Sequence, residues 1–271
     1  MQVFRVAGAL LLGAALAGCS SSSNGASGGG ATGGSGAATG SGGSGAATGS
    51  GGSGAAAGSG STGGGPSGGG CTVGASETGD GTYYAADGSG NCSFDPSPND
   101  LMVAAMNDPD YAGSAVCGEC VQVKGPSGDV TVRIVDRCPE CKHGDLDLSP
   151  QAFAKIADPK LGRVTIHWTP VACDVQGPIR YRFKEGANQW WTAVQVRNHR
   201  YPIAKFEYQK AGKWVAVPRE SYNYFVETSG MGPGPYSFRV TDVKGNVLTD
   251  KNIPLKVAAE VAGAAQFPTC P

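Results

Sequence analysis

The sequence predicts a mainly β protein in which two folded modules follow a glycine-rich tether. Residues 20–70 hold 23 of the 45 glycines and no Asp, Glu, Lys or Arg. The rest of the chain contains short stretches of alternating apolar residues separated by turn residues, which is typical of β-strands. Its charge is divided, since residues 71–174 carry a balance of −8 and residues 175–271 one of +6. These features exclude a wholly disordered protein and a single 271-residue domain, and a net charge of −1 argues against a nucleic-acid partner.

Residues 1–18 are predicted to be a lipoprotein signal peptide. Arg5 supplies the positive charge, and the apolar run 6–16 is too short to span a bilayer. Leu-Ala-Gly-Cys at 16–19 resembles a bacterial lipobox, which predicts lipidation of Cys19. We expect export and lipid anchoring at the bacterial outer membrane or cell surface, with the folded part extracellular. The alternative is a plain secretory signal with an unmodified cysteine.

Residues 19–70, which begin with the lipidated Cys19, are predicted to be a flexible, disordered Gly/Ser/Ala linker. A nine-residue unit repeats at 33–41, 42–50 and 51–59, with Ala57 replacing Thr in the last copy. A coil of this composition has a root-mean-square reach of roughly 40 Å. The linker therefore holds the folded part clear of the membrane.

Eight further cysteines agree with export, because an even count in an oxidising compartment predicts up to four disulfides. The spacing Cys117-x-x-Cys120 and Cys138-x-x-Cys141 also fits a four-thiolate zinc site, which the oxidising compartment disfavours. We expect no metal and no cofactor. The three histidines are scattered and receive no role: His143, His167 and His199.

The pattern of residues 71–174 predicts strands with two short helices. Helices are expected over 97–106 and, after the cap Ser149-Pro150, over 151–157. Gly125-Pro126-Ser127-Gly128 predicts a hairpin between strands at 121–123 and 130–135. A further strand is expected over 163–168.

Everything after Gly177 is predicted to be β and to form a sandwich. Trp214, which is followed by Val215 and Val217, is assigned to its core. The expected strands are 180–183, 190–196, 203–208, 213–217, 222–227 and 236–243, with a tight turn at 244–246.

Several runs resemble bacterial expansins, and the resemblance extends over residues 77–268. The runs are Cys117–Cys120, Val132–Pro139 and Gly144–Ser149 in the first module, and Arg182–Gly186, Trp190-Trp191, Val194–His199 and Tyr222–Val226 in the second. The resemblance implies a six-stranded double-psi β-barrel over 71–174, followed by an immunoglobulin-like, carbohydrate-binding β-sandwich over 175–271.

The resemblance also implies the disulfide pairing, because barwin-like barrels link their cysteines in a shared pattern. The implied pairs are Cys92–Cys117, Cys120–Cys173, Cys138–Cys141 and Cys71–Cys270.

The same resemblance implies a polar, wall-loosening cluster formed by Thr82, Asp136 and Asp147. Asp147 matches the general acid of family-45 glycoside hydrolases, but expansins lack the second carboxylate that hydrolysis needs. Asp87 is a candidate base by sequence proximity, although its glycine-rich neighbourhood favours a turn. The alternative for Asp147 is a purely structural role, that of a solvated residue just before a helix N-terminus, where negative charge is favoured.

One departure concerns Cys138, which stands where bacterial expansins often have an aromatic residue. Tyr83 or Tyr84 is the candidate replacement in the groove.

Carbohydrate binding is assigned to Trp190, Trp191 and Tyr222, whose exposed rings would stack on sugar rings, with Lys184 donating to a hydroxyl. The alternative is that these aromatic rings belong to the core of the sandwich, since Trp is usually buried. A regular strand would expose only Trp191, so exposure of both rings requires Trp190 to precede the strand or to lie at a bulge.

The leading hypothesis is a non-hydrolytic, monomeric expansin that binds cellulose and related β-glucans and loosens glucan–glucan contacts. The +6 balance of the second module also predicts attraction to acidic wall matrix polysaccharide. The membrane is contacted only through the lipid anchor. The alternatives are an endoglucanase, a peptidoglycan lytic transglycosylase, and a carbohydrate-binding adhesin with an inert barrel.

Overall fold

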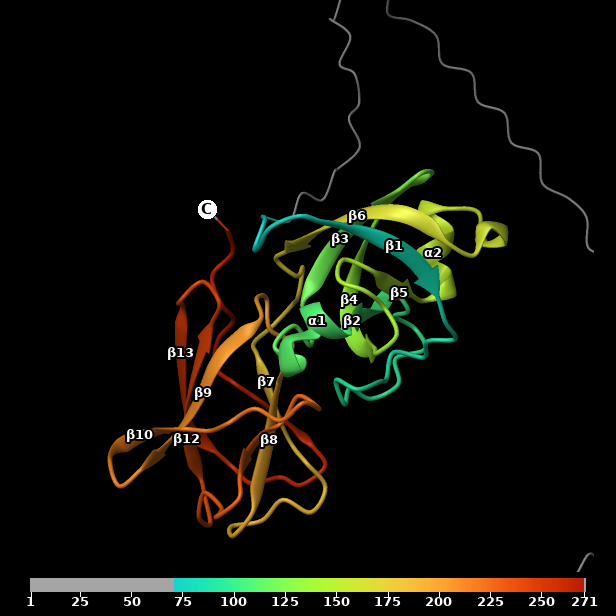
Figure 1. The fold of residues 1–271 in the computed structure, drawn as a ribbon. Helices are drawn as coiled ribbons and strands as arrows, with labels where there is room; N and C mark the ends of the chain where they lie inside the picture. The colour runs from blue at the N-terminus through green and yellow to red at the C-terminus, as the bar shows by residue number, and fades with distance from the viewer. Residues whose placement is uncertain (1–70, 271) are drawn as a thin grey trace, which may run out of the picture. The chain divides into compact units, whose positions relative to one another are not determined.

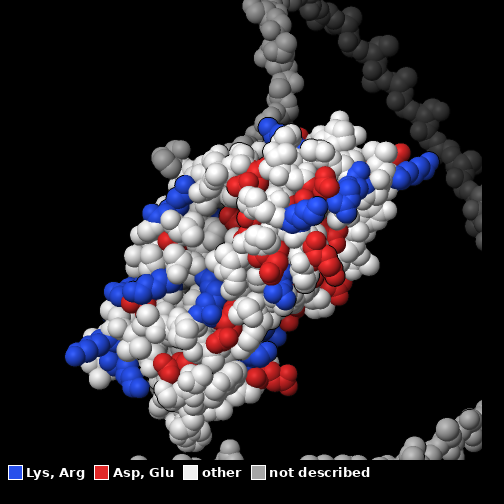
Figure 2. Space-filling view, viewed as in Figure 1, with Lys and Arg blue, Asp and Glu red and all other residues white. Residues whose placement is uncertain are grey.

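The computed structural model describes residues 71–270; the predicted signal peptide, Cys19 and the linker over 19–70 lie outside the described residues. The described part consists of a closed β-barrel followed by two four-stranded sheets (Figure 1). None of its helices is long and apolar enough to cross a membrane. On the face shown in Figure 2, Asp and Glu gather over the barrel, in agreement with the negative charge of that half of the sequence.

Six strands close the barrel in the order β1-β5-β2-β4-β3-β6. Two of the pairs, β1 with β5 and β2 with β4, are parallel, and the remaining pairs are antiparallel. The strands are β1 (Glu77–Tyr83), β2 (Val103–Asn107), β3 (Cys120–Gly125), β4 (Gly128–Cys138), β5 (Leu146–Leu148) and β6 (Val164–Val171). The short helical segments are α1 (Asp108–Tyr111), η1 (Ala112–Ser114), α2 (Pro150–Ile156) and η2 (Pro159–Leu161).

Helix α2 begins where the sequence predicts. The Ser149 hydroxyl accepts a hydrogen bond from the Ala152 N–H, and Pro150 occupies the first turn, where its missing N–H costs nothing. The helix buries Phe153 and Ile156 in the same hydrophobic core as the inward residues of the barrel strands. The predicted hairpin is confirmed as β3 and β4, whose pairing runs to Gly125 opposite Gly128.

The helix expected over 97–106 is wrong, because residues 103–107 form strand β2. This strand lies between β4 and β5, and all five of its residues are buried. A strand that is covered on both faces has a continuous apolar sequence, and period alone does not separate such a run from a short buried helix.

The second half of the described chain forms two antiparallel sheets, β10-β9-β12-β13 and β11-β8-β7-β14. One hydrophobic core, rich in aromatic residues, contains buried side chains from both sheets, which is the packing of a β-sandwich. The strands are β7 (Arg180–Phe183), β8 (Thr192–Arg197), β9 (Ile203–Lys210), β10 (Lys213–Ala216), β11 (Phe225–Glu227), β12 (Tyr236–Asp242), β13 (Val247–Ile253) and β14 (Glu260–Ala262).

Trp214 does not belong to the sandwich core, contrary to the prediction. It lies on the edge strand β10, where Val215 points inward and Trp214 therefore points outward. Its ring is half-buried under the Arg239 guanidinium, 4.8 Å from the ring centroid, and Glu207 holds that arginine through two hydrogen bonds.

Within residues 71–270, four disulfides join the eight cysteines in the pairs that the expansin resemblance implies. Three lie within the barrel module: Cys92–Cys117, Cys120–Cys173 and Cys138–Cys141. The fourth, Cys71–Cys270, joins residues 199 positions apart in the sequence. Both of its cysteines pack against the sandwich core.

Strand β8 is buried on both faces, because residues of the barrel module cover its outer face. Gln195 donates a hydrogen bond of 2.8 Å to the Cys92 carbonyl. Arg197 donates to the Asp95 carboxylate at 2.6 Å and to the Ser93 carbonyl at 3.1 Å. It also contacts Glu260 at 2.9 Å, so the charge of this buried side chain, which is only 8% exposed, is paired with two carboxylates. Ala193 is covered instead by Tyr224 and Val226 of its own module, so all six residues of the strand are buried.

Arg197 is expected to matter much more for stability than Arg180, although both pair with Glu260. Replacing Arg197 by Met leaves the buried Gln195 Oε1 without its donor and breaks the ion pairs with Asp95 and Glu260, which should lower the free energy of unfolding by about 2 kcal/mol. Arg180→Met, at a side chain that is 47% exposed, should cost less than about 1 kcal/mol. Equilibrium urea unfolding of the two variants measures the difference, and equal losses would contradict the assignment.

The shifted pKa values of two buried groups make the free energy of unfolding depend on pH in opposite directions. Burial raises the pKa of Glu119 from 4.5 to about 7, so its stability contribution falls as pH rises through that window. Burial, followed by the nearby Arg219 charge, lowers the pKa of His199 from 6.5 to about 4, so its contribution falls as pH drops through the same range. Each effect amounts to about 3 kcal/mol, and the two slopes nearly cancel.

Glu119→Gln should leave the pH dependence of stability due to His199 without the opposing contribution of Glu119. The variant should be more stable than the parent at pH 8, by up to about 3 kcal/mol, and should lose stability steadily between pH 6.5 and pH 4. Chemical unfolding across this range is the measurement, with the exposed Glu185→Gln as the control. A Glu119→Gln profile that stays as flat as that of the parent would refute the argument.

Candidate functional site

A row of residues at one level crosses four adjacent barrel strands. Thr82 on β1 lies opposite Asp147 on β5, and Ala105 on β2 lies opposite both Asp147 and Asp136 on β4. The small Ala105 thus separates the two carboxylate positions, which are two strand spacings, or about 10 Å, apart between Cα atoms. The register therefore places Thr82, Asp147 and Asp136 along one surface of the barrel.

Asp147 is a half-buried carboxyl group with one fixed donor. The Thr82 hydroxyl donates to Asp147 Oδ1 at 2.6 Å. Burial raises the pKa of Asp147, and the charges of Asp136 and Glu140 act in the same direction, whereas the Thr82 hydrogen bond and Arg163 oppose the shift. A carboxyl group in this environment takes up a proton more readily than an exposed aspartate and can donate it to a sugar oxygen.

Asp136 is held by the backbone rather than by another side chain. Its Oδ1 accepts hydrogen bonds from the Asn91 N–H at 2.6 Å and from the Arg137 N–H at 2.8 Å. The Tyr84 hydroxyl is buried nearby, and no described residue makes a geometrically good hydrogen bond to it. Burial and the charges of Asp136 and Asp147 raise the Tyr84 pKa, so both aspartates act on the same phenol.

Of the two tyrosines that are candidates to replace an aromatic ring at position 138, Tyr84 lies beside the two aspartates, whereas the face of β1 opposite to that of Thr82 carries Tyr83. The Tyr83 side chain is 39% exposed and its ring lies 4.9 Å from that of Phe153. Cys138 is buried in its disulfide and offers no surface to a ligand. Asp87, the candidate second carboxylate, accepts hydrogen bonds from the Ser89 N–H and hydroxyl and is a turn residue.

Trp190 lies in a turn immediately before strand β8 and is 72% exposed. The Asn188 side chain fixes this turn, because its Oδ1 accepts from the N–H groups of Trp190 and Trp191 at 2.9 and 3.1 Å. Gly230, at φ +73°, packs against the same turn, and any Cβ there would overlap the Gln189 carbonyl. Trp190 thus precedes the regular strand, which is one of the two arrangements that allow its exposure.

The remaining binding candidates lie around a small cluster on the outer face of sheet β11-β8-β7-β14. Trp191 and Tyr222 are half-buried against Ala193 and Val226. Lys184 Nζ lies 5.7 Å from the Tyr222 ring centroid and 5.1 Å from that of Tyr224. We call the following set the aromatic patch: Trp190, Trp191, Tyr222, Tyr224 and Lys184.

Tyr224 is the member of the patch that sequence reasoning missed as a site residue. Its ring is 4% exposed and lies 6.0 Å from Tyr222, so it supports the patch from beneath. The sequence does contain a signal for this role, because Tyr222 and Tyr224 are alternate residues of an extended segment and such residues share a face.

Asn91 connects the polar row with the loop that bears Tyr222. Its backbone N–H donates to Asp136, and its side-chain amide donates to the Ser221 carbonyl at 2.9 Å and to the Tyr111 hydroxyl at 2.8 Å. The Tyr111 hydroxyl donates to the same Ser221 carbonyl at 3.0 Å. A short chain of hydrogen bonds therefore runs from a carboxylate of the barrel to Ser221, the residue that precedes Tyr222 of the aromatic patch.

Comparison with known proteins agrees with this architecture. The family model described as lytic transglycolase matches residues 103–168. Expansin-YoaJ of Bacillus subtilis is 42% identical over 198 residues, which are 69% of this chain and 84% of that protein. Expansin-like protein 2 of Dictyostelium discoideum is 34% identical over 61% of this chain and 44% of its own length.

Two solved structures of a Clavibacter michiganensis expansin are similar over the whole of their chains and 72% of this one, at 31% identity. The apo form has a TM-score of 0.68, and a variant solved in complex with cellohexaose has a TM-score of 0.69.

The fold and its polar row define the class of double-psi β-barrel proteins that carry a C-terminal β-sandwich. Within that class, the sequence identity extends across both modules rather than the barrel alone. The chain belongs to the expansin family, and its similarity includes bacterial members.

Proposed function

We propose that this protein binds cellulose and related β-glucans and loosens glucan–glucan contacts without hydrolysing them. The observation that carries the proposal is Trp190, a large aromatic ring that is 72% exposed on a turn fixed by Asn188. Exposed, rigidly held aromatic rings suit stacking on the apolar faces of sugar rings. The relative solved with cellohexaose supports a glucan as the ligand.

The loosening step is assigned to the barrel. A glucan chain held on the aromatic patch would meet Thr82 and Asp147, which exchange hydrogen bonds with sugar hydroxyls in competition with neighbouring chains. Because its pKa is raised, the Asp147 carboxyl group takes up a proton more readily, and in that form it donates as well as accepts a hydrogen bond. Asp136 orders the Asn91 segment and so fixes the barrel surface relative to the patch.

The second candidate is a glycan-cleaving enzyme, either an endoglucanase or a lytic transglycosylase. The lytic transglycolase match and the raised pKa of Asp147, suitable for a general acid, favour it. Against hydrolysis, Asp87 is engaged in its turn and Asp136 is bound by two backbone N–H groups.

Three assays separate these functions. Reducing-sugar release from cellulose and muropeptide release from sacculi report cleavage, and creep of isolated plant walls reports loosening. We expect creep without either product. Product release that disappears in Asp147→Asn would establish the enzyme instead, and cellulose binding with neither creep nor product would leave a carbohydrate-binding adhesin.

We further propose that the protein is exported, lipid-anchored through Cys19 and monomeric, with the sandwich also attracted to acidic wall matrix polysaccharide. The lipobox-like sequence supports export and anchoring, and the positive charge of residues 175–271 supports attraction to an acidic polysaccharide. Cys19→Ala should release the protein from the membrane fraction. Pectin binding should fall as salt rises, because exposed charges are screened.

A further inference from the structure

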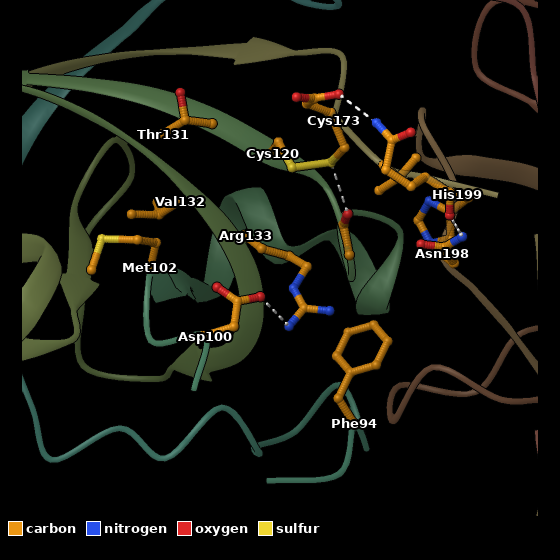
Figure 3. Close-up of a pocket in the computed structure, with 14 residues that line it drawn as sticks. Phe94, Asp100, Met102, Cys120, Thr131, Val132, Arg133, Cys173, Asn198 and His199 are labelled. Carbon is orange, nitrogen blue, oxygen red and sulfur yellow. Dashed lines mark hydrogen bonds and ion pairs between the residues drawn. A yellow bond between two sulfur atoms is a disulfide. The ribbon is translucent and has the colours of Figure 1, made fainter. Parts of the chain in front are cut away.

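A cavity of about 480 Å³ lies away from the aromatic patch, beside the Cys120–Cys173 disulfide (Figure 3). Asn198 and His199, which follow the end of β8, line it, whereas Trp190 precedes the start of that strand. Six strand residues, or about 20 Å, therefore separate the two places along β8. The volume falls within the range of about 300–1,000 Å³ that is typical of small-molecule sites.

His199 presents an unpaired acceptor in this cavity. The side chain is 4% exposed, and its Nδ1 lies 2.8 Å from the Tyr201 carbonyl, which can only accept. Nδ1 is therefore protonated, and Nε2 of the neutral ring is an acceptor for which no described residue supplies a donor. Burial lowers the pKa of His199 to about 4, so the ring stays neutral at physiological pH.

Gly118 keeps this acceptor accessible. A Cβ at position 118 would come within 2.8 Å of His199 Nε2, and Gly118 lines the same cavity. Asn198 adds a second acceptor, because its amide group donates to the carbonyls of Gln176 and Pro178 and leaves Oδ1 free.

The barrel side of the cavity supplies donors and an apolar surface. Figure 3 shows the Arg133 side chain between Asp100 and Phe94, with His199 and Asn198 across the cavity. The guanidinium lies 5.3 Å from the Phe94 ring centroid and has one ion pair, a long contact of 3.5 Å to Asp100. Several of its five N–H donors therefore remain for a ligand.

We propose that this cavity binds one neutral sugar unit. Its groups alternate between donors and acceptors beside an aromatic ring, which suits a ligand rich in hydroxyl groups. An apolar ligand would leave His199 Nε2 and Arg133 unsatisfied. An anionic ligand would meet Asp100 and Asp174 as well as Arg133, so the charge balance of the lining disfavours it. The proposal is independent of the function assigned to the aromatic patch.

The test uses the three histidines of the chain as internal reporters. In the Trp190→Ala protein, cellobiose should shift the Nε2 resonance of His199 in a saturable manner. The exposed His143 and His167 should not move. A His199 resonance that does not respond, or equal shifts of all three, overturns the proposal.

Two further arms identify the ligand and the donors. Cellohexaose that shifts His199 as cellobiose does indicates the end of a glucan chain, whereas a response to cellobiose alone indicates a free sugar. A response to galacturonic acid without one to cellobiose overturns the assignment of a neutral ligand.

Arg133→Gln should weaken the cellobiose response at least tenfold. Arg163→Gln, at another barrel arginine that is paired with an aspartate, should leave it unchanged. Equal affinity in Arg133→Gln contradicts the proposed geometry.

Discussion

Replacing Trp190 and Trp191 together by alanine is expected to remove most of the affinity for insoluble cellulose. Each ring face that stacks on sugar removes on the order of 80 Å² of apolar surface from water, which corresponds to about 2 kcal/mol. Because Trp191 is half-buried already, we expect a combined loss on the order of 30- to 100-fold. The loss should be nearly independent of salt, because no charge is removed. Pull-down on crystalline cellulose at two salt concentrations measures it.

The single variants distinguish a surface role from a core role. Trp190→Ala should weaken binding without lowering the melting temperature, since the ring is 72% exposed. Trp191→Ala should lower both, because this ring also packs against the sandwich core. Trp214→Ala is the matched control, a half-buried tryptophan on the other sheet that should leave cellulose binding unchanged. Binding that survives the double replacement would remove the aromatic patch from the mechanism.

Replacing Asp147 by asparagine is expected to abolish wall loosening and to leave cellulose binding almost unchanged. Asparagine keeps the size of the side chain and an oxygen that accepts the Thr82 hydrogen bond, so the barrel surface is preserved. It cannot take up or release a proton. Creep of isolated plant walls should fall to the level of heat-inactivated protein.

The control for Asp147→Asn is Asp87→Asn, at an exposed aspartate in a turn that asparagine also supports. This variant should retain full creep activity. Normal creep in Asp147→Asn would mean that the polar row is not where loosening occurs, whereas parallel loss of creep and binding would mean that the substitution disturbs the fold.

The sequence was sufficient to predict the elements whose ends carry clear chemistry. Ser149-Pro150 marks the start of α2, and Gly125 to Gly128 marks the β3–β4 hairpin. The sequence does not identify strand β2 as a strand, because its apolar run has no period. Strand β13 is not predicted either, because its sequence is polar and five of its seven residues are at least partly exposed.

The candidate site was predictable by residue but not by arrangement. Sequence reasoning named Thr82, Asp136 and Asp147, yet the separation of the two aspartates by Ala105 depends on β2 lying between β4 and β5. That pairing joins segments distant in the chain, which local patterns do not encode. The same limitation applies to Asn91 and His199, because their roles depend on contacts between the barrel and the sandwich modules.

The Cys71–Cys270 disulfide provides a covalent path from the N-terminal end of the described part into the sandwich module. If the chain is held at its N-terminal side while the aromatic patch grips a glucan, tension enters the described part at Cys71. The disulfide passes this load directly to Cys270 and the sandwich core, against which both cysteines pack. The disulfide therefore shares the load with the backbone hydrogen bonds that join Cys71 and Val73 to Ala172 and Pro170 at the end of β6, so that only part of the tension acts on the barrel.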